Sequence, residues 1–247
     1  MAVLAETGRF PIAIHTIKTI IRYFFHIIQA PDTSLIKRIY TESLEQKNTF
    51  ILKIENLFNI LGFSHVWENQ GTFSISRLEN AMINKLKEKY VNFWKETRNE
   101  NSCAYNKKLR TYNTFKGDYK LEDYLLLDIE KKEISTFVKL RISDSKLMIE
   151  QGRHRNMPLE KRICPICETD IEDEYHFITQ CNTLDTHRVE LYNDLAEIIP
   201  DFIKFSDREK FLYIMKPKDN DLYKVCIKGI YNMYEKRRTY NQGKQSS

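Results

Sequence analysis

Apolar side chains recur at every third or fourth position over most of this 247-residue chain. That spacing places them on one face of an α-helix. Residues 12 to 29 show the pattern most clearly, and residues 49 to 61, 76 to 99 and 130 to 151 repeat it. The chain has only 7 glycines and 6 prolines, which favours long helices over many tight turns. We therefore predict an all-α, multi-helical fold.

Several of the predicted helices carry residues that favour helix ends. Gly62 follows an apolar run, at the point where a helix end prefers a left-handed residue. Ser76 with Glu79, and Ser206 with Glu209, have the spacing of a capping box, in which the serine and the glutamate each bond the other's backbone N–H. The sequence therefore predicts a helix end at the glycine and a helix start at each serine.

Large aliphatic side chains become rare between residues 99 and 118, and this stretch is the predicted boundary between domains. We expect an N-terminal helical domain over residues 1 to 99, a linker over 100 to 118 and a second helical domain over 119 to 247. The linker mixes cations with aromatic rings, a composition that can stack on single-stranded nucleic acid. A solvated linker has the same composition, so both interpretations stay open.

Four side chains that bind metals lie close together in the second domain. Cys164 and Cys167 can bind one metal from a single tight turn, and His176 and Cys181 follow within the next fourteen positions. Three thiolates and one imidazole complete a tetrahedral set of ligands. We predict a small Cys-Cys-His-Cys zinc knuckle over residues 158 to 182, inserted between helices and holding one structural Zn²⁺.

Two alternatives to this ligand set remain. The cysteines could form a disulfide or remain as buried thiols, but the chain shows no secretory signal and disulfides are rare inside cells. His187 lies close enough to compete as the fourth ligand. We prefer Cys181, because a thiolate binds zinc well and its short separation from His176 closes a compact knuckle.

The charge of the chain changes sign where the knuckle begins. Residues 131 to 162 hold nine Lys and Arg against four Asp and Glu, a net charge of +5, whereas residues 163 to 200 hold one against nine, a net charge of −8. Such a step suggests a cationic surface beside the knuckle. Within the acidic segment, Glu172, Asp173 and Glu174 directly precede the histidine ligand and could accept hydrogen bonds from its imidazole.

The basic segment suits the phosphates of RNA or DNA, because Arg and Lys bind phosphate oxygens and release counterions. Ordinary surface charge is the alternative. The candidate phosphate-binding residues are Arg141, Lys146, Arg153, Arg155, Lys161 and Arg162, and the candidates for base stacking are Tyr175 and Phe177. Binding of this kind is expected to depend strongly on salt and weakly on sequence.

Motifs along nearly the whole chain resemble the C-terminal, post-polymerase region of reverse transcriptases encoded by non-LTR retrotransposons. They are GRFP at residues 8 to 11, LGFSHVWE at 61 to 68, LRIS at 140 to 143, IEQGR at 149 to 153, PLEKR at 158 to 162 and EDEYHF at 172 to 177. The last two run into the predicted zinc ligands and are the most specific part of the resemblance.

The resemblance implies a nucleic-acid-binding tail that holds an RNA template or a target DNA. It also implies a partner, the polymerase portion of a retroelement protein. The polymerase of that family carries an aspartate pair, and this sequence contains no Asp-Asp. We therefore expect no polymerase or nuclease activity from the chain itself.

Other functions stay open. The chain could be a protein-interaction module with a purely structural zinc, or a decayed element copy without function. A catalytic zinc would need a ligand replaced by water and a general base such as Glu174, which the full set of four ligands disfavours. The sequence has no secretory signal and no window of about eighteen uncharged apolar residues. We expect an intracellular protein, nuclear or cytoplasmic, with no membrane contact and no small-molecule substrate.

Overall fold

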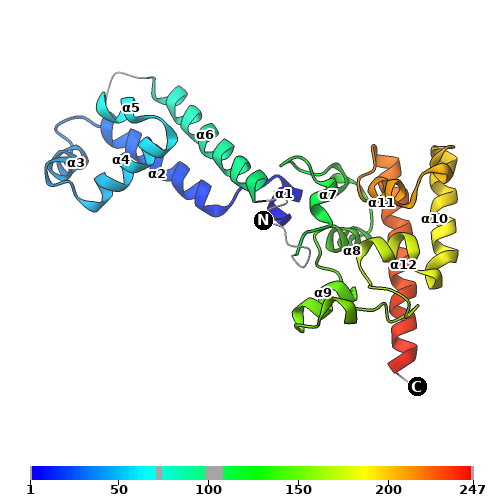
Figure 1. Cartoon of the computed structure of the whole chain (residues 1–247). Helices are drawn as coiled ribbons and strands as arrows, with labels where there is room; N and C mark the ends of the chain where they lie inside the picture. Colours follow the sequence, from blue (N-terminus) through cyan, green and yellow to red (C-terminus); the bar gives the residue numbers. More distant parts are fainter. Residues whose placement is uncertain (1, 71–73, 98–107, 246–247) are drawn as a thin grey trace. The chain divides into compact units, whose positions relative to one another are not determined.

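The computed structural model describes residues 2 to 70, 74 to 97 and 108 to 245, and side chains up to residue 240. Within these ranges the regular secondary structure is almost entirely helical (Figure 1). Its β-structure there is limited to two isolated bridges, Thr7 with Leu121 and Ile163 with Ile171. The prediction of an all-α fold with the Cys-Cys-His-Cys segment between helices is confirmed.

The chain folds as two compact units, each with its own hydrophobic core. The helical unit is Phe10–Thr97, and the knuckle unit combines Met1–Arg9 with Arg98–Ser247. This division differs from the predicted one, because the first nine residues belong with the C-terminal part of the chain. Tyr112 and Phe115 of the predicted linker are buried in the knuckle unit. Residues 100 to 107 of that linker lie outside the described residues.

In the described part of the helical unit, five helices pack around a cluster of aromatic rings. Phe24 lies at its centre, with ring centroids 4.9 Å from Phe58 and 5.7 Å from Trp67. Helix α2 packs against α3 and α6, and α4 packs against α3, α5 and α6. The helices are α2 (Ile12–Gln29), α3 (Leu35–Gln46), α4 (Thr49–Leu61), α5 (Ser64–Glu68) and α6 (Ile75–Glu96).

The helix ends of this unit test two of the sequence predictions. Gly62 ends α4 with a φ of +83°, a left-handed conformation that glycine adopts without strain. The capping box predicted at Ser76 is wrong, because α6 begins one residue earlier and has Ser74 as its N-cap. The Glu79 carboxylate instead accepts a hydrogen bond from Arg22 of α2.

The knuckle unit is built around its last helix, α12 (Asn220–Gln245), which packs against α8 and α10. Ser206 and Glu209 form the predicted capping box at the start of α11. The other elements are α1 (Ala2–Thr7), α7 (Tyr112–Phe115), η2 (Asp123–Leu126), α8 (Lys131–Arg141), α9 (Met148–His154), η3 (Leu159–Lys161), η4 (His176–Gln180), η5 (Asn182–Leu184), α10 (Asp185–Ile198), η6 (Phe202–Lys204) and α11 (Asp207–Met215).

The single helix predicted over residues 130 to 151 is wrong. Helix α8 ends at Arg141, Ser143 adopts a left-handed φ of +53°, and α9 starts at Met148. Gly152 lies inside α9 and not at its end. A Cβ atom at this glycine would lie 2.6 Å from Cγ of Arg162, so the glycine allows the arginine to pass against the helix.

A buried ionic cluster joins α1 to the rest of the knuckle unit. The Arg141 guanidinium is fully buried, with its Nη2 atom 3.2 Å from Glu6 Oε1 and 3.1 Å from Glu122 Oε2. It also lies over the ring of Phe115, 4.5 Å from the centroid. Lys116 pairs with Glu122 on the other side. The prediction that Arg141 contacts phosphates is therefore wrong, since its charge is used inside the core.

Candidate metal centre

The first two ligands lie on a tight turn that its own backbone closes. The N–H of Cys164 donates to the carbonyl of Asp170 at 2.8 Å, and the N–H of Glu168 donates to the Cys164 carbonyl at 2.9 Å. Glu168 has a left-handed φ of +58° and so reverses the chain. Cys164 and Cys167 therefore present their sulfur atoms from the same small loop, as the spacing of two residues predicts.

The other two ligands flank a single widened helical turn, η4. The Asp173 carboxylate accepts from the N–H of His176 at 2.8 Å and so fixes the start of this turn. At its end, the N–H of Cys181 donates to the His176 carbonyl at 2.9 Å. Arg188 of α10 holds the turn from the side, because its guanidinium donates to the carbonyls of Ile178 at 3.0 Å and Cys181 at 2.6 Å.

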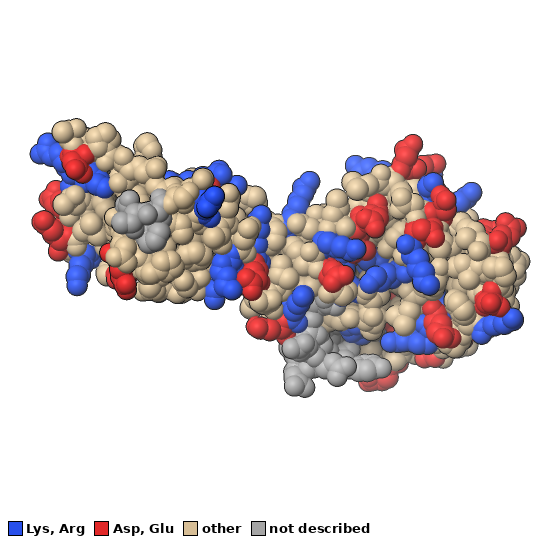
Figure 2. Space-filling view, turned by 90° about the horizontal axis from the view of Figure 1, so that it is seen from above, with Lys and Arg blue, Asp and Glu red and all other residues tan. Residues whose placement is uncertain are grey.

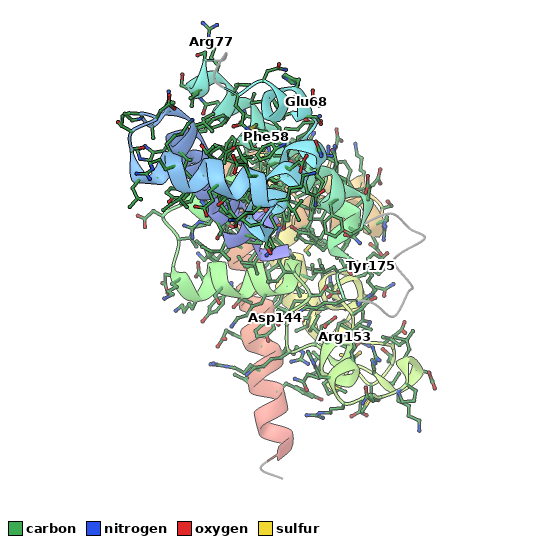
Figure 3. All side chains as sticks on the ribbon, turned by 90° about the vertical axis from the view of Figure 1, so that its left-hand side faces the viewer. Phe58, Glu68, Arg77, Asp144, Arg153 and Tyr175 are labelled. Atoms are coloured by element: carbon green, nitrogen blue, oxygen red, sulfur yellow. The ribbon has the colours of Figure 1, made fainter. Side chains whose placement is uncertain are left out.

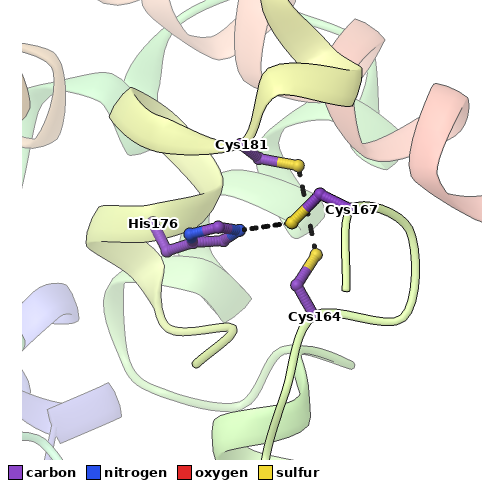
Figure 4. A group of neighbouring side chains, drawn as sticks. All are labelled: Cys164, Cys167, His176 and Cys181. Carbon is purple, nitrogen blue, oxygen red and sulfur yellow. Dashed lines mark hydrogen bonds between the residues drawn. The ribbon is translucent and has the colours of Figure 1, made fainter. Parts of the chain in front are cut away.

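The four ligand atoms all lie within 4.8 Å of one another (Figure 4). The sulfur atoms of Cys164 and Cys181 are 4.0 Å apart, and the Cys167 sulfur is 3.3 Å from Nε2 of His176. The cysteines are free thiols, which argues against the disulfide alternative. His187 lies outside the cluster, and its Nδ1 atom contacts the Glu190 carboxylate at 3.1 Å. The structure thus brings the four predicted ligands together.

This cluster fits a metal ion in size and in chemistry. Two ligand atoms at corners of a tetrahedral zinc are separated by roughly 3.6 to 3.8 Å. The distances of 3.3 and 4.0 Å between two pairs of ligand atoms in the cluster lie on either side of that value. Thiolate and imidazole are the donors that zinc favours. All four corners are supplied by the protein, so the set leaves no open position for a bound water.

The thiols of Cys164 and Cys181 are joined by a hydrogen bond. This hydrogen bond, together with burial, raises the pKa of Cys164 to about 12. The same hydrogen bond lowers the pKa of Cys181. Cys164 therefore holds its proton more firmly than Cys181, and a bound metal would displace the thiol protons of both.

Glu172 is fully buried beside the cluster, but on a different side from the one predicted. Its Oε1 atom lies 3.7 Å from the sulfur of Cys164, and its Oε2 atom accepts from the N–H of Met148 at 2.7 Å. Arg237 of α12 donates to the same carboxylate, with Nη2 at 2.7 Å from Oε2. Nδ1 of His176 has no hydrogen-bond partner among the described residues. The predicted imidazole acceptor thus supports a thiol instead.

Glu174 is also turned inward. Its side chain is fully buried, and its Oε2 atom accepts from Arg110 at 2.7 Å and from Thr111 at 2.8 Å. Burial raises the pKa of Glu174, and the neighbouring Arg110 charge acts against that rise. Because Glu174 is not part of the four-residue cluster and its carboxylate is bound by an arginine, the described geometry does not favour it as a general base at the metal position.

Three of the predicted nucleic-acid contacts are buried and therefore wrong. Besides Arg141, the Arg162 guanidinium donates to the carbonyls of Ile149 at 3.1 Å and Met157 at 2.8 Å, so it holds α9 against the knuckle. Phe177 is 1% exposed and packs edge-on against a tyrosine of α12. These side chains belong to the core of the knuckle unit and cannot meet a ligand at its surface.

The other predicted contacts reach the surface to different extents. Lys146, Arg155 and Lys161 are exposed, and no ion pair involves them in the part of the chain that the structure describes. Arg153, labelled in Figure 3, is half-buried and donates to the Glu150 carboxylate at 2.7 Å. Tyr175 is half-buried with its ring edge-on against a phenylalanine of α11.

The sequence did not predict the roles of three arginines that support the cluster. Arg110, Arg188 and Arg237 lie 54, 24 and 73 residues from the first cysteine ligand, at position 164. Nothing in their local sequence distinguishes them from surface arginines. The signal that could have found them is the number of acids inside the knuckle, because a buried carboxylate needs a cation from elsewhere in the chain.

Comparisons with known proteins identify no family or function for this chain. Family models, curated proteins and solved structures were all compared with this chain, and none of them matches it. Among the described residues, no helix combines the length and the apolar character needed to cross a membrane. Fold and site together define an all-helical protein with a Cys₃His cluster able to hold one metal ion.

Proposed function

We propose that this chain is a zinc-dependent nucleic-acid-binding protein related to the post-polymerase region of non-LTR retrotransposon reverse transcriptases. One structural zinc would be held by Cys164, Cys167, His176 and Cys181, the donor set that fits this metal. When bound, it would supply a cross-link between the cysteine turn and η4. Because three ligands are thiols, the protein needs a reducing compartment, which the nucleus and the cytoplasm provide.

Zinc bound here would stabilise the fold and not a reaction. The four ligands come from two short segments, and the metal would contribute on the order of 10 kcal/mol to their folding, in addition to the apolar contacts that Ile166, Phe177 and Ile178 make with the core. With every corner occupied by the protein, no water is activated at the metal. We therefore propose no enzymatic activity for this chain.

The observation that carries the nucleic-acid part of the proposal is the separation of charge around the knuckle. Glu172 and Glu174 are buried and bound by arginines, whereas Lys146, Arg155 and Lys161 are exposed on the segments that enter the knuckle. Two of the nine acids of the acidic segment are thus removed from the surface, while the three cations remain exposed. Exposed cations without an acidic partner attract phosphates.

The face of the molecule shown in Figure 2 has no large area of a single charge. Lys and Arg are interspersed there with Asp and Glu. We therefore propose that binding to a polyanion uses exposed cations without an acidic partner, of which Lys146, Arg155 and Lys161 lie on the segments that enter the knuckle.

Three of the six motifs that resemble the retroelement family contribute residues around the proposed metal centre. Gly152 of the IEQGR motif makes room for Arg162 of the PLEKR motif, and Glu172 and Glu174 of the EDEYHF motif are the buried carboxylates beside the cluster. These residues are therefore needed to build the knuckle, which gives the resemblance a structural reason. We propose the polymerase portion of a retroelement protein as a partner, together with RNA or DNA.

The test combines zinc content with binding to a labelled single-stranded RNA and a DNA duplex over a salt series. The full chain is compared with a triple variant, Lys146→Gln, Arg155→Gln and Lys161→Gln. We expect one zinc per chain in both. In the triple variant, the dependence of log affinity on log salt should be shallower by about 1 for each phosphate that the altered side chains no longer neutralise.

A matched triple variant controls for overall charge. Lys131, Lys139 and Lys228 are exposed cations of the same unit, and their replacement by Gln removes the same charge away from the knuckle. Equal binding by the two triple variants would refute the proposed surface. Zinc without binding to either nucleic acid would favour the protein-interaction module instead.

A further inference from the structure

The Glu172 carboxylate lies between a metal ligand and an arginine from the last helix. Its Oε1 atom is 3.7 Å from the Cys164 sulfur, and Arg237 contacts both of its oxygens. Glu172 is fully buried and Arg237 is 5% exposed. A sulfur ligand, a carboxylate and a guanidinium therefore stand in a row, largely out of contact with water.

A metal-loaded cluster would place a large negative charge in this row. Zn²⁺ with three thiolates and a neutral imidazole has a net charge of −1, and the adjacent carboxylate raises the total to −2. Binding the metal converts the Cys164 thiol, which donates to Glu172 in the metal-free state, into a thiolate, and its proton passes to solvent. A thiolate and a carboxylate then face each other where burial makes repulsion strong.

Other arginines near the cluster are occupied by different partners. Arg188 pairs with Asp185 and donates to two carbonyls, and Arg162 donates only to carbonyls among the described residues. Arg237 is the cation that meets the carboxylate beside the sulfur. It remains charged there, because burial alone would lower its pKa but the bond with Glu172 raises it.

We propose that Arg237 is the counter-charge that allows a metal to bind next to the buried Glu172, and that it thereby couples metal loading to the docking of the C-terminal part of α12. The inference rests on the metal half of the proposed function and is independent of nucleic-acid binding. Arg237 acts here as a positioning residue, since it reaches the metal ligand through Glu172.

The coupling follows from where Arg237 is anchored. Its Nη2 atom also donates to the Lys146 carbonyl at 3.0 Å, and the hydroxyl of Tyr234, one turn earlier in α12, accepts from the Lys146 N–H at 3.3 Å. Helix α12 is thus tied at this point to the segment before α9 and to the knuckle. By reciprocity, if Arg237 strengthens metal binding, then metal binding strengthens this tie by the same factor.

The test measures zinc affinity of the full chain by competition with a chromophoric chelator. We expect Arg237→Gln to weaken zinc binding at least tenfold, in the range found when groups behind metal ligands are removed. Arg238→Gln is the matched control, because Arg238 is 59% exposed and pairs with Glu235 on the same helix. It should bind zinc within twofold of the unaltered chain.

A second substitution separates charge from packing. Glu172→Gln keeps a carbonyl oxygen that can accept from the Met148 N–H, but it removes the negative charge beside Cys164. In the double variant Glu172→Gln with Arg237→Gln the repulsion is gone, so we expect zinc affinity to return to within about threefold of the unaltered chain. A double variant as weak as Arg237→Gln alone would overturn the proposal and make the tie purely mechanical.

Hydrogen exchange tests the coupling directly, even if Arg237→Gln binds zinc too weakly for titration. We expect zinc to slow exchange of amides around Tyr234 in the unaltered chain and in Arg238→Gln, but not in Arg237→Gln. The same slowing in all three would overturn the inference. An unaltered chain that binds no zinc would instead refute the proposed function, so the two failures are distinguishable.

Discussion

In the helical unit every fully buried side chain that the structure describes is hydrophobic, whereas the knuckle unit also buries polar and charged groups. The buried polar residues are Glu6, Lys116, Glu122, Arg141, Ser143, Ser145, Glu150, Arg162, Glu172, Glu174, His176, Thr179, Arg188 and Arg237, and none of them lies between residues 10 and 97. The two units are thus stabilised by different interactions, although both are made of helices.

The difference matters because an apolar core and a polar core respond differently to amino-acid substitutions. Apolar side chains pack without fixed partners, so their pattern along a helix is enough to specify a face. A buried charge needs a particular partner in a particular geometry, and the loss of that partner is strongly destabilising. The helical unit should therefore tolerate repacking, and the knuckle unit should fail when single polar contacts are removed.

Removal of the metal is the largest expected effect and should divide the units most sharply. Cys164→Ser, or chelation, should release the metal, destabilise the knuckle by on the order of 10 kcal/mol and loosen residues 158 to 182, while the helical unit stays folded. Segment-resolved hydrogen exchange measures both. Cys226→Ala removes a buried thiol that is not a ligand and should keep the zinc. Unchanged zinc content in Cys164→Ser would refute the ligand assignment.

Loss of an aromatic ring should unfold the helical unit without affecting the metal. Phe58→Ala removes a fully buried ring that contacts Phe24 and Trp67, and should cost about 3 to 5 kcal/mol of that unit's stability. Urea unfolding followed by tryptophan fluorescence measures the loss. Phe50→Ala, on the same helix but 38% exposed, should cost much less. A drop in zinc content would show that the units are not independent.

Removal of the buried arginine should instead destabilise the knuckle unit and leave the helical unit unchanged. Arg141→Met leaves the Glu6 and Glu122 carboxylates buried without their cation and should cost about 3 to 5 kcal/mol in the knuckle unit. The exposed Lys139→Met on the same helix should change stability by less than about 0.5 kcal/mol. Equal unfolding midpoints for these two variants would show that the buried ionic cluster contributes no net stability.

The smallest expected effect is a difference in stability between two serine-to-alanine variants, one in each unit. Ser206→Ala breaks a capping box and should cost about 1 kcal/mol in the knuckle unit. Ser76→Ala should be neutral or slightly stabilising, because Ser76 is exposed inside α6 and forms no cap. Thermal unfolding of the two variants measures the contrast. A loss at Ser76 as large as at Ser206 would favour the capping box that the sequence predicted.

Local patterns in the sequence predicted local structure well. The apolar period indicated the bounds of α2, and Gly62 marked the end of α4, because the residues that determine these features are neighbours along the chain. The ligands of the metal centre were predictable for the same reason. Two cysteines on one turn and a histidine and a cysteine on the next need only short-range geometry to meet.

Contacts between distant residues were not predictable from the sequence. Arg141 and Arg162 look like surface cations until Glu6 and the carbonyls of α9 are placed beside them. The break between α8 and α9 depends on a left-handed serine, which the apolar period does not reveal. Glu172 was assigned to the wrong ligand, because its partner Arg237 lies 65 residues away.

The knuckle unit is made of two stretches of sequence that lie before and after the helical unit, and this sets an order of folding during synthesis. Glu6 and Arg141 are 135 residues apart, and a ribosome adding about 5 to 20 residues per second needs roughly 7 to 27 s to join them. The helical unit, whose contacts lie within one continuous segment, is complete before then. Helix α1, six residues long, is too short to persist alone. Helix α1 is therefore synthesised before the helical unit but joins its own unit only after the helical unit is complete.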